Sequence, residues 1–211
     1  MVIAIDGPAG AGKSTVARAV ADRLGFTYLD TGAMYRCVAL AALRGGGDPA
    51  ALASTVTITV GDRVTLDGED VSEAIRAPEV AQAASKVAVI ATVRRAMVDL
   101  QRQTLSSGDW VIEGRDTGSV VAPGAELKVF LTADAHERAR RRAAQHGLEV
   151  NAVMAEQERR DRRDRTRTAS PLTVAPDALT LDTTGLSLEQ VVTRLVELAN
   201  QRRDRAGSEG A

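Results

Sequence analysis

Cysteine, lysine and aromatic residues are all scarce in this 211-residue sequence. The one cysteine, Cys37, excludes a disulfide within the chain and fits a reducing compartment. Because Cys37 lies on the apolar side of a stretch with helical spacing, we expect it to be a buried structural thiol. Aromatic residues make up only 2% of the sequence, so Val, Leu, Ile and Ala must fill the core.

The sequence also lacks a dominant charge and a long apolar run. Its formal net charge is −1, so no overall field attracts a nucleic-acid polymer or a membrane surface. No stretch approaches the roughly 20 consecutive apolar residues of a transmembrane helix. The chain begins directly with a short strand pattern, without the basic and apolar segments of a signal peptide. We therefore expect a cytoplasmic, soluble protein that acts as a monomer.

Arginine, in contrast, is abundant. Only three of the 27 basic residues are lysine, and ten arginines fall between Arg138 and Arg167. The planar guanidinium group can grip a phosphate with two parallel hydrogen bonds, which an ammonium group cannot do. The basic residues of this chain are therefore suited to phosphate-bearing ligands.

Short apolar strands alternate with helical patterns along most of the chain. Strands are predicted at residues 2–5, 26–29, 110–113, 127–131 and 178–181. Helices are predicted at residues 14–24, 33–43, 78–105, 135–145, 151–165 and 187–201. This alternation predicts an α/β fold, a three-layer sandwich with a mostly parallel central sheet. Ligands of such sheets bind beyond the carboxyl ends of the strands.

One segment breaks the alternation and suggests domain boundaries. Residues 56–66 alternate apolar and polar side chains with period two, which indicates short antiparallel strands. We therefore assign residues 46–90 to a small inserted subdomain and residues 147–167 to a charged helical lid. The core comprises residues 1–45, 91–146 and 168–204, and residues 205–211 form a flexible tail.

The segment Gly7 to Ser14 matches the phosphate-loop pattern G-x-x-x-x-G-K-[ST] without a mismatch. A strand precedes it and a helix follows, so backbone amides and the helix N-terminus can bind phosphate. Lys13 can reach the β- and γ-phosphates, and Ser14 can bind Mg²⁺ with the nucleotide, partly through water. The predicted ATP-binding residues are Gly7, Pro8, Ala9, Gly10, Ala11, Gly12, Lys13, Ser14 and Thr15.

The loop alone does not distinguish a kinase from a switch GTPase or a motor. Asp182 to Gly185 matches D-x-x-G in letters, but the guanine-reading N-K-x-D is absent from the sequence, so we interpret the segment as a turn. The size of the chain favours a small kinase. Phosphoryl transfer depends on positioning and positive charge, which Arg36, Arg94 and Arg115 can supply.

Residues 158–167 form a run of arginines and acids. Composition alone favours a solvated helix face with pairs three and four residues apart. However, Arg160, Asp164 and Arg167 follow the spacing i, i+4 and i+7, which places them on one face of a helix. An acid between two arginines can hold their guanidinium groups or accept a hydrogen bond from a sugar hydroxyl, as a lid requires.

Several segments together resemble the bacterial cytidylate kinase family of nucleoside monophosphate kinases. They are IDGPAGAGKST (5–15), LDTGAMYR (29–36), AASKVA (83–88), VR (93–94), EGRDTG (113–118) and the lid residues 160–167. They occur in order along the whole chain, and the segments 29–36 and 114–118 are specific to the family. The resemblance implies transfer of the ATP γ-phosphate to CMP, and to dCMP, with Mg²⁺ as cofactor and the insertion binding CMP.

The resemblance also implies roles for individual residues. Ser85, Arg94 and Asp116 resemble the residues that read cytosine, since Asp116 can accept from the exocyclic amine that uracil lacks. The implied CMP-binding set is Thr31, Arg36, Ser85, Arg94, Arg115, Asp116, Arg160, Asp164 and Arg167. The implied catalytic set is Lys13, Arg115, Arg160 and Arg167. Glu113 stands where some relatives have Asp, which leaves its part in the Mg²⁺ site open.

Two other functions remain as alternatives. One is a kinase of related fold that phosphorylates a small non-nucleotide metabolite. The other is a nucleotide-dependent binding module or switch without transferase activity. This alternative gives no function to the segment 114–118 or to the charged lid helix. A panel of acceptors with ATP separates these alternatives from CMP phosphorylation.

Overall fold

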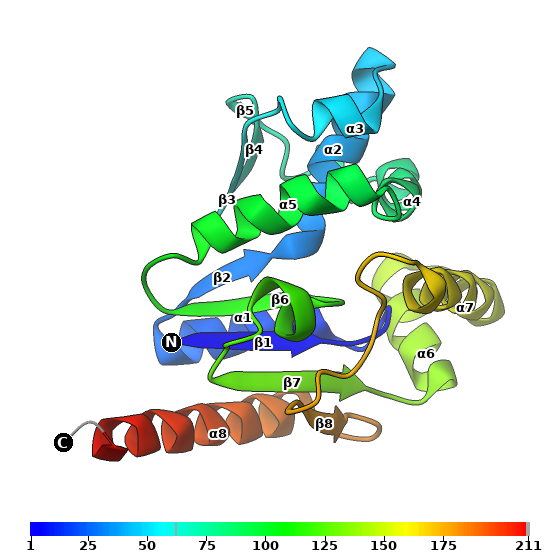
Figure 1. Cartoon of the computed structure of the whole chain (residues 1–211). Coiled ribbons are helices and arrows are strands. Elements are labelled where there is room, and N and C mark those ends of the chain that lie inside the picture. Colours follow the sequence, from blue (N-terminus) through cyan, green and yellow to red (C-terminus); the bar gives the residue numbers. More distant parts are fainter. Residues whose placement is uncertain (62, 210–211) are drawn as a thin grey trace. The chain divides into compact units, whose positions relative to one another are not determined.

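The computed structural model describes residues 1–61 and 63–209, which form two compact units (Figure 1). The first unit comprises residues 1–28 and the chain from 108 onward, and the second comprises residues 29–107. The inserted subdomain expected at 46–90 falls within the second unit.

A five-stranded sheet is the centre of the fold. Its strands are β1 (Val2–Asp6), β2 (Thr27–Asp30), β6 (Trp110–Gly114), β7 (Leu127–Thr132) and β8 (Leu179–Asp182), in the order β2-β6-β1-β7-β8. The pairs β1–β6, β1–β7 and β7–β8 are parallel, with Asp6 opposite Gly114 and Phe130. The α/β prediction is therefore confirmed. This register brings the phosphate loop after β1 next to the segment that follows β6.

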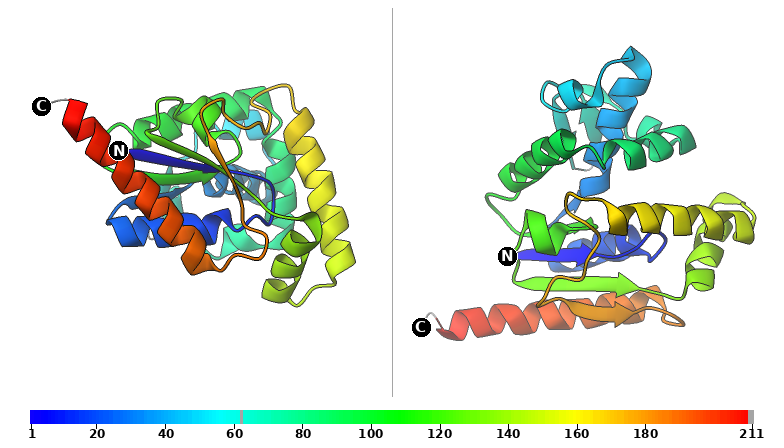
Figure 2. Two further views of the ribbon diagram at one scale, coloured as in Figure 1. Left: turned by 90° about the horizontal axis from the view of Figure 1, so that it is seen from below. Right: turned by 45° about the vertical axis from the view of Figure 1, so that its right-hand side comes forward.

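Two helices cover one face of this sheet, α1 (Lys13–Leu24) and α8 (Leu188–Glu209). Aliphatic side chains from both helices and from the strands, such as Val20, Ile5 and Leu195, form one buried cluster. Figure 2 shows α8 lying along the sheet beside α1. The core is filled by aliphatic residues and alanine, as predicted.

Helix α8 starts with a reciprocal cap and is longer than expected. The Ser187 Oγ accepts from the Gln190 N–H at 3.2 Å, and the Ser187 N–H donates to Gln190 Oε1 at 2.9 Å. The helix continues to Glu209, so residues 205–209 of the expected tail are helical. Residues 210–211 lie outside the described part of the chain.

A packed helix pair lies beyond the carboxyl ends of β1 and β7 (Figure 1). Helix α6 (Ala135–His146) ends at Gly147, whose φ of 64° is left-handed, and α7 (Val150–Thr166) packs against α6. The segment expected as a lid, 147–167, contains α7. After β6 a π-helical turn, η2 (Thr117–Val121), packs against β1.

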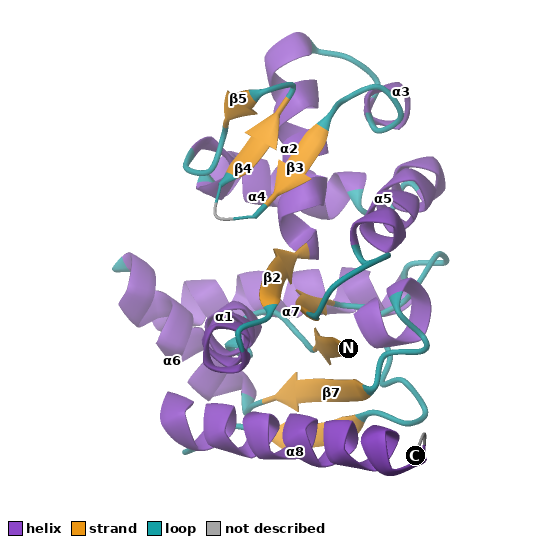
Figure 3. Ribbon diagram, turned by 90° about the vertical axis from the view of Figure 1, so that its left-hand side faces the viewer, coloured by secondary structure: helices purple, strands orange, loops and turns teal. Residues whose placement is uncertain are grey.

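The second unit combines helices with a small antiparallel sheet (Figure 3). Its helices are α2 (Thr31–Gly45), α3 (Pro49–Leu52), η1 (Ala74–Arg76), α4 (Pro78–Val87) and α5 (Ala91–Thr104), and its strands are β3 (Ile58–Val60), β4 (Val64–Leu66) and β5 (Glu69–Asp70). The predicted antiparallel strands are confirmed, whereas the single helical stretch 78–105 is divided at 88–90. Cys37 is fully buried in α2, so the prediction of a buried thiol is confirmed. Burial raises its pKa to about 11.

Candidate active site

The phosphate loop runs from the end of β1 to the start of α1 and is closely packed. Gly7 has a φ of 152°, and a Cβ on it would lie 2.1 Å from the Leu131 carbonyl oxygen, so no side chain fits there. Gly12, with a φ of 83°, forms the N-cap of α1. These two glycines let the loop curve tightly with its backbone close to neighbouring atoms.

Lys13 is the first residue of α1 and is buried. Its Nζ donates to the Pro8 carbonyl oxygen at 2.9 Å, across the loop. Burial above all, together with the positive charges of Arg115 and Arg160, lowers the Lys13 pKa to about 7. Three predicted catalytic cations therefore act on one another at the phosphate loop.

A chain of alternating charges links the end of β6 to the end of α7. Arg115 Nε donates to Asp164 Oδ2 at 2.9 Å, and Arg167 Nη1 lies 3.8 Å from Asp164 Oδ1. Arg167 Nη2 also donates to Asp116 Oδ1 at 3.2 Å. Four of the residues that the sequence assigned to CMP thus contact one another within the first unit.

The Asp164 carboxylate is held in its charged form. Burial alone would raise its pKa, but the guanidinium groups of Arg115, Arg160 and Arg167 lower the pKa below its usual range. The carboxylate therefore fixes the orientation of the Arg115 guanidinium in a site that is largely closed to water.

The prediction that Arg160, Asp164 and Arg167 share a helix face is wrong for Arg167. Helix α7 ends at Thr166, and Arg167 follows it with extended backbone angles, φ −64° and ψ 139°. The chain turns back at this point, because the Leu172 N–H donates to the Asp164 carbonyl oxygen at 2.8 Å. Arg167 reaches Asp164 and Asp116 from this turn.

Four further predicted CMP residues, Thr31, Arg36, Ser85 and Arg94, lie in the second unit. Asp30 caps α2 by accepting from the Ala33 N–H at 3.1 Å, and it also accepts from Arg36 Nη2 at 2.6 Å. Thr31 is buried at the first position of the same helix. A guanidinium group held by a carboxylate at a helix N-terminus is suited to a phosphate ligand.

Ser85 and Arg94 are buried on α4 and α5, the helices that pack against α2. Arg94 Nη1 donates to the Ala88 carbonyl oxygen at 3.2 Å. The guanidinium carbon of Arg94 also lies 5.3 Å from the centre of the Tyr35 ring on α2. Tyr35 is a neighbour of the site to which the sequence analysis assigned no role.

A comparison with protein-family models places this arrangement in a known group. The model described as cytidylate kinase matches residues 3–201. The chain belongs to the cytidylate kinase family.

Individual members of the family are similar over nearly their whole length. The chain is 49% identical to the cytidylate kinase of Mycobacterium leprae, over 96% of each chain. It is 50% identical to that of Limosilactobacillus fermentum over 92% of each, and 47% identical to that of Solibacter usitatus over 96% of this chain and 93% of the relative. The resemblance inferred from the sequence motifs is confirmed.

Solved structures with low sequence identity share the fold of this cytidylate kinase family member. A gluconokinase from Sinorhizobium meliloti matches with a TM-score of 0.53 at 18% identity, covering 98% of this chain and 96% of the other. A shikimate kinase from Bacteroides thetaiotaomicron matches with a TM-score of 0.50 at 17% identity, over 95% and 98%. These likenesses support the phosphate-loop kinase fold alone.

Asp6 is a site residue that the sequence analysis missed in this family member. Its buried carboxylate accepts from the Thr117 N–H at 2.8 Å, the Thr117 hydroxyl at 2.9 Å and the Gly118 N–H at 2.8 Å. Burial raises the Asp6 pKa, and these hydrogen bonds oppose that rise. Asp6 thereby fastens the turn that carries Arg115 and Asp116. An acid at the end of a buried strand was the available signal.

A pocket of about 340 Å³ adjoins the phosphate loop. The loop and the start of α1 form one side of it. The other lining residues come from α6, from the β8–α8 connection and from α8, and they are Arg141, Arg142, Gln145, Thr183, Leu186, Leu188 and Val191. Only the loop residues were predicted from the sequence. The mixture of apolar and polar side chains fits a nucleoside better than a single phosphate.

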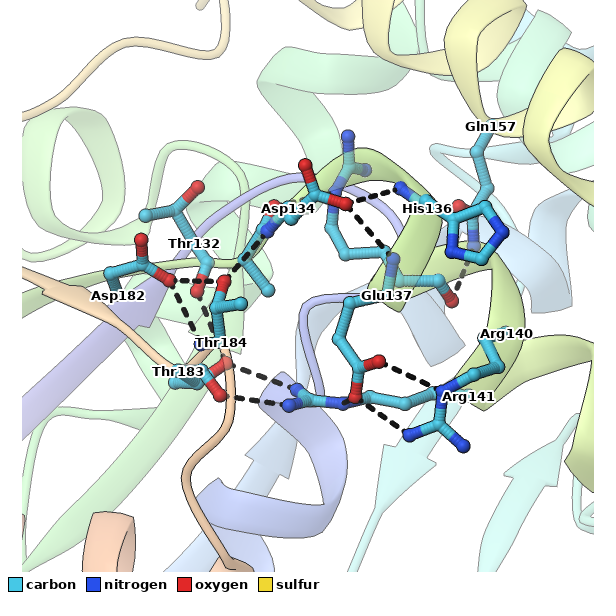
Figure 4. A network of polar contacts seen from close by, with 12 residues as sticks. Thr132, Asp134, His136, Glu137, Arg140, Arg141, Gln157, Asp182, Thr183 and Thr184 are labelled. Carbon is cyan, nitrogen blue, oxygen red and sulfur yellow. Dashed lines mark hydrogen bonds and ion pairs between the residues drawn. The ribbon is translucent and has the colours of Figure 1, made fainter.

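Arg141 is fixed at the wall of this pocket by a network that Figure 4 shows. Arg141 Nε donates to Glu137 at 2.8 Å, while its Nη1 and Nη2 donate to the hydroxyl and carbonyl oxygens of Thr183 at 3.1 and 2.8 Å. The Thr184 N–H donates to Asp182 at 2.8 Å. The interpretation of residues 182–185 as a turn is therefore confirmed.

The residues near the loop fit a metal ion that is carried mainly by the nucleotide. Among the described residues, no group of three or more His, Cys, Asp or Glu side chains could hold a metal ion. Ser14 is exposed at the start of α1, so its hydroxyl is accessible to a bound ion. The Glu113 carboxylate accepts from the Tyr28 hydroxyl at 3.0 Å.

Across residues 1–61 and 63–209, no helix is long and apolar enough to cross a membrane.

Proposed function

We propose that this protein transfers the γ-phosphate of ATP to CMP, and also to dCMP, giving ADP and the cytidine diphosphate. Membership in the cytidylate kinase family supports the reaction. The observation that carries the proposal is the set of three cations at the phosphate loop, Lys13, Arg115 and Arg160. Burial lowers the pKa of Lys13, and the positive charges of the two arginines contribute to that lowering. Such an arrangement is poised for a highly anionic ligand.

The donor nucleotide binds along the first unit in this proposal. The loop amides and Lys13 hold the phosphates of ATP. The adjoining pocket takes its nucleoside, with the Arg141 guanidinium, fixed by Glu137 and Thr183, as one wall. Ser14 would hold the Mg²⁺ that accompanies ATP, partly through water, and the ion would neutralise part of the phosphate charge.

The proposed acceptor is CMP, and nine residues are assigned to it. Arg36, Arg115 and Arg167 are the proposed ligands of its phosphate. Ser85, Arg94 and Asp116 are the proposed readers of its base, with Asp116 accepting from the exocyclic amine. Thr31, Arg160 and Asp164 complete the set, the last two near the ribose and the transferred group. In the proposal these contacts to the ribose do not strictly require its 2′-hydroxyl, so dCMP, which lacks this group, also serves as acceptor.

The chemistry requires little from the protein beyond position and charge. The acceptor phosphate is already largely anionic near neutral pH, so it attacks in line without a strong general base. Arg115, Arg160 and Arg167 neutralise charge that develops on the transferred group. Helix α7 covers the phosphate loop and limits the access of water, which would otherwise hydrolyse ATP. The proposal includes a monomeric, cytoplasmic enzyme with small nucleotides as its substrates.

An acceptor panel tests the proposal. Purified protein is incubated with ATP and either CMP, dCMP, UMP, AMP, shikimate or gluconate, and nucleotide products are separated by chromatography. We expect CDP and dCDP to form fastest, and chelation of divalent cations to abolish both. Phosphorylation of an alcohol with no turnover of CMP would instead support the small-metabolite kinase.

A further inference from the structure

Helix α7 touches the phosphate loop through a carboxylate that has no assigned role. Asp161 is buried, and its Oδ1 accepts from the backbone N–H of Ala9, inside the loop, at 2.9 Å. Its Oδ2 accepts from Arg138 Nη1, on α6, at 2.7 Å. One side chain of α7 therefore joins the loop to the neighbouring helix.

Arg138 completes a closed arrangement around Ala9. The same Nη1 donates to the Ala9 carbonyl oxygen at 2.7 Å, and Nε donates to the Ala133 carbonyl oxygen at 3.2 Å. The N–H and the C=O of Ala9 are thus both held by side chains. The Arg138 and Asp161 side chains are only 10% and 7% exposed, so removal of one would leave a buried charge without its partner.

Gln157 makes a second contact between α7 and the loop, one turn before Asp161. Its side-chain nitrogen lies 2.3 Å from where a Cβ on Gly10 would be, so the absence of a side chain at Gly10 lets it approach. The same nitrogen donates weakly to the Arg138 carbonyl oxygen at 3.4 Å (Figure 4). Residues 157 and 161 lie on one face of the helix, and this face docks on the loop.

We propose that Asp161 is a positioning residue that fastens α7 to the phosphate loop through Ala9 and Arg138. Arg160 directly precedes Asp161, and Asp164 lies one turn later on the same helix. A helix fixed at Asp161 sets the positions of Arg160, whose charge acts on Lys13, and of Asp164, which accepts a hydrogen bond from Arg115. This inference rests on the proposed function, because its consequence is the alignment of groups for phosphoryl transfer.

The first test is Asp161→Asn, which keeps the shape of the side chain and removes its charge. We expect kcat for CMP phosphorylation to fall about 10- to 100-fold, as for a misplacement of about 1 Å in a transfer site. The KM for CMP should rise by a smaller factor than kcat falls, because Asp161 does not itself bind CMP but positions Arg160 and Asp164, which the proposed function assigns to CMP. Glu158→Gln, which alters an exposed acid on the same helix, is the matched control and should leave both constants unchanged.

A double-mutant cycle distinguishes positioning from general destabilisation. Arg138 and Asp161 act through the same contacts to Ala9. The double variant Arg138→Met with Asp161→Asn should therefore have a kcat no lower than that of the more impaired single variant. Independent, multiplying losses would overturn the proposal. If circular dichroism shows that Asp161→Asn is unfolded, the variant Arg138→Lys is tested in its place. Lysine cannot bridge Ala9 and Asp161 as arginine does, so kcat should again fall by a larger factor than the KM for CMP rises.

A measurement without turnover completes the test. Hydrogen exchange of a peptide spanning the phosphate loop should quicken in Asp161→Ala, because the Ala9 N–H loses its acceptor, and should stay unchanged in Glu158→Gln. Unchanged exchange, or wild-type kcat in folded Asp161→Asn, would overturn the role of Asp161. Absence of CMP phosphorylation in the wild type would instead reject the proposed function, while the exchange result would still stand or fall by itself.

Discussion

Lys13 shows how one side chain combines conflicting requirements. It must carry a positive charge to hold phosphate, yet it is buried beside Arg115 and Arg160. Burial and these charges lower its pKa from 10.5 to about 7 in the protein without nucleotide. Phosphate groups favour the charged form, so binding of ATP and protonation of Lys13 are linked.

This linkage predicts a pH-dependent uptake of protons. Below about pH 7 Lys13 is already charged, whereas at about pH 8.5 it must gain a proton when ATP binds, so the affinity for ATP should fall as pH rises between these values. Calorimetry in two buffers of different ionisation enthalpy should detect proton uptake at the higher pH. Lys13→Arg, which stays charged, is the control and should abolish the uptake. An absence of uptake in the wild type would contradict the lowered pKa.

Arg115 is the cation that Asp164 orients directly, through a hydrogen bond of 2.9 Å. We predict that Arg115→Ala lowers kcat for CMP by at least about 100-fold, because charge that develops in the transition state loses a preorganised partner. Initial rates at saturating ATP and CMP provide the measurement. Arg159→Ala, an exposed arginine on α7, should have no effect. Intact transfer in Arg115→Ala would rule out the proposed site.

Asp116 determines the choice of base in the proposed function. Asp116→Ala should narrow the ratio of kcat/KM between CMP and UMP, because the acceptor for the exocyclic amine is gone. Asp116→Asn should narrow it further, since the amide can donate to the uracil carbonyl. Rates at limiting concentrations of each acceptor give the ratio directly. A ratio equal to that of the wild type in both variants would remove Asp116 from base recognition.

At the level of elements, strands and the phosphate loop were predictable because their signals are local. The apolar run before Gly7 predicts β1, and the loop pattern fixes the turn into α1. The turn η2, which carries no regular pattern, could not be predicted in the same way. Asp6 stabilises it from 111 residues away along the chain, and only the sheet register reveals that proximity.

Helix α7 shows the same limit for side chains. The helix itself follows from its spacing, but the sequence favoured the face with Arg160, Asp164 and Arg167. The structure buries Gln157 and Asp161 together with Asp164, and Arg167 is buried from the turn that follows the helix. Arginine-rich runs offer several equivalent faces, so the docking partner, here Ala9 with Arg138, decides which one is buried.

Glu137 gives a stability prediction for helix α6. Hydrogen bonds from Arg140 and Arg141 lower its pKa from 4.5 to about 2. Because its pKa is lowered on folding, the charged Glu137 side chain stabilises the folded protein at pH values above its unfolded pKa of 4.5. This contribution is lost as the pH falls from 4.5 toward 2. The difference in free energy of unfolding between wild type and Glu137→Gln should therefore shrink over that range in urea titrations. For Glu158→Gln the difference should stay small throughout; a constant difference for Glu137→Gln would contradict the lowered pKa.

At the scale of the whole molecule, the two units carry different parts of the proposed function. The first unit contains the phosphate loop, the adjoining pocket and the α7 contacts, and the second contains Thr31, Arg36, Ser85 and Arg94. The break in the strand and helix alternation predicts an inserted subdomain at residues 46–90, and the second unit comprises residues 29–107. In sequence α2 and α5 look like core helices, yet α2 packs with α4 and the small sheet, and α5 packs with α2 and α3.

The central claim is that CMP is the phosphoryl acceptor. A competition experiment tests it most directly: CMP, UMP and isotopically labelled AMP at equal concentration share limiting unlabelled ATP with Mg²⁺, and the acceptor-derived products, CDP, UDP and labelled ADP, are quantified together. The label separates ADP made from AMP from the ADP that the donor ATP leaves in every turnover. Their ratio reports the ratio of kcat/KM values. The account predicts that CDP dominates the products. Equal amounts of CDP and UDP, or a predominance of ADP derived from AMP, would contradict it.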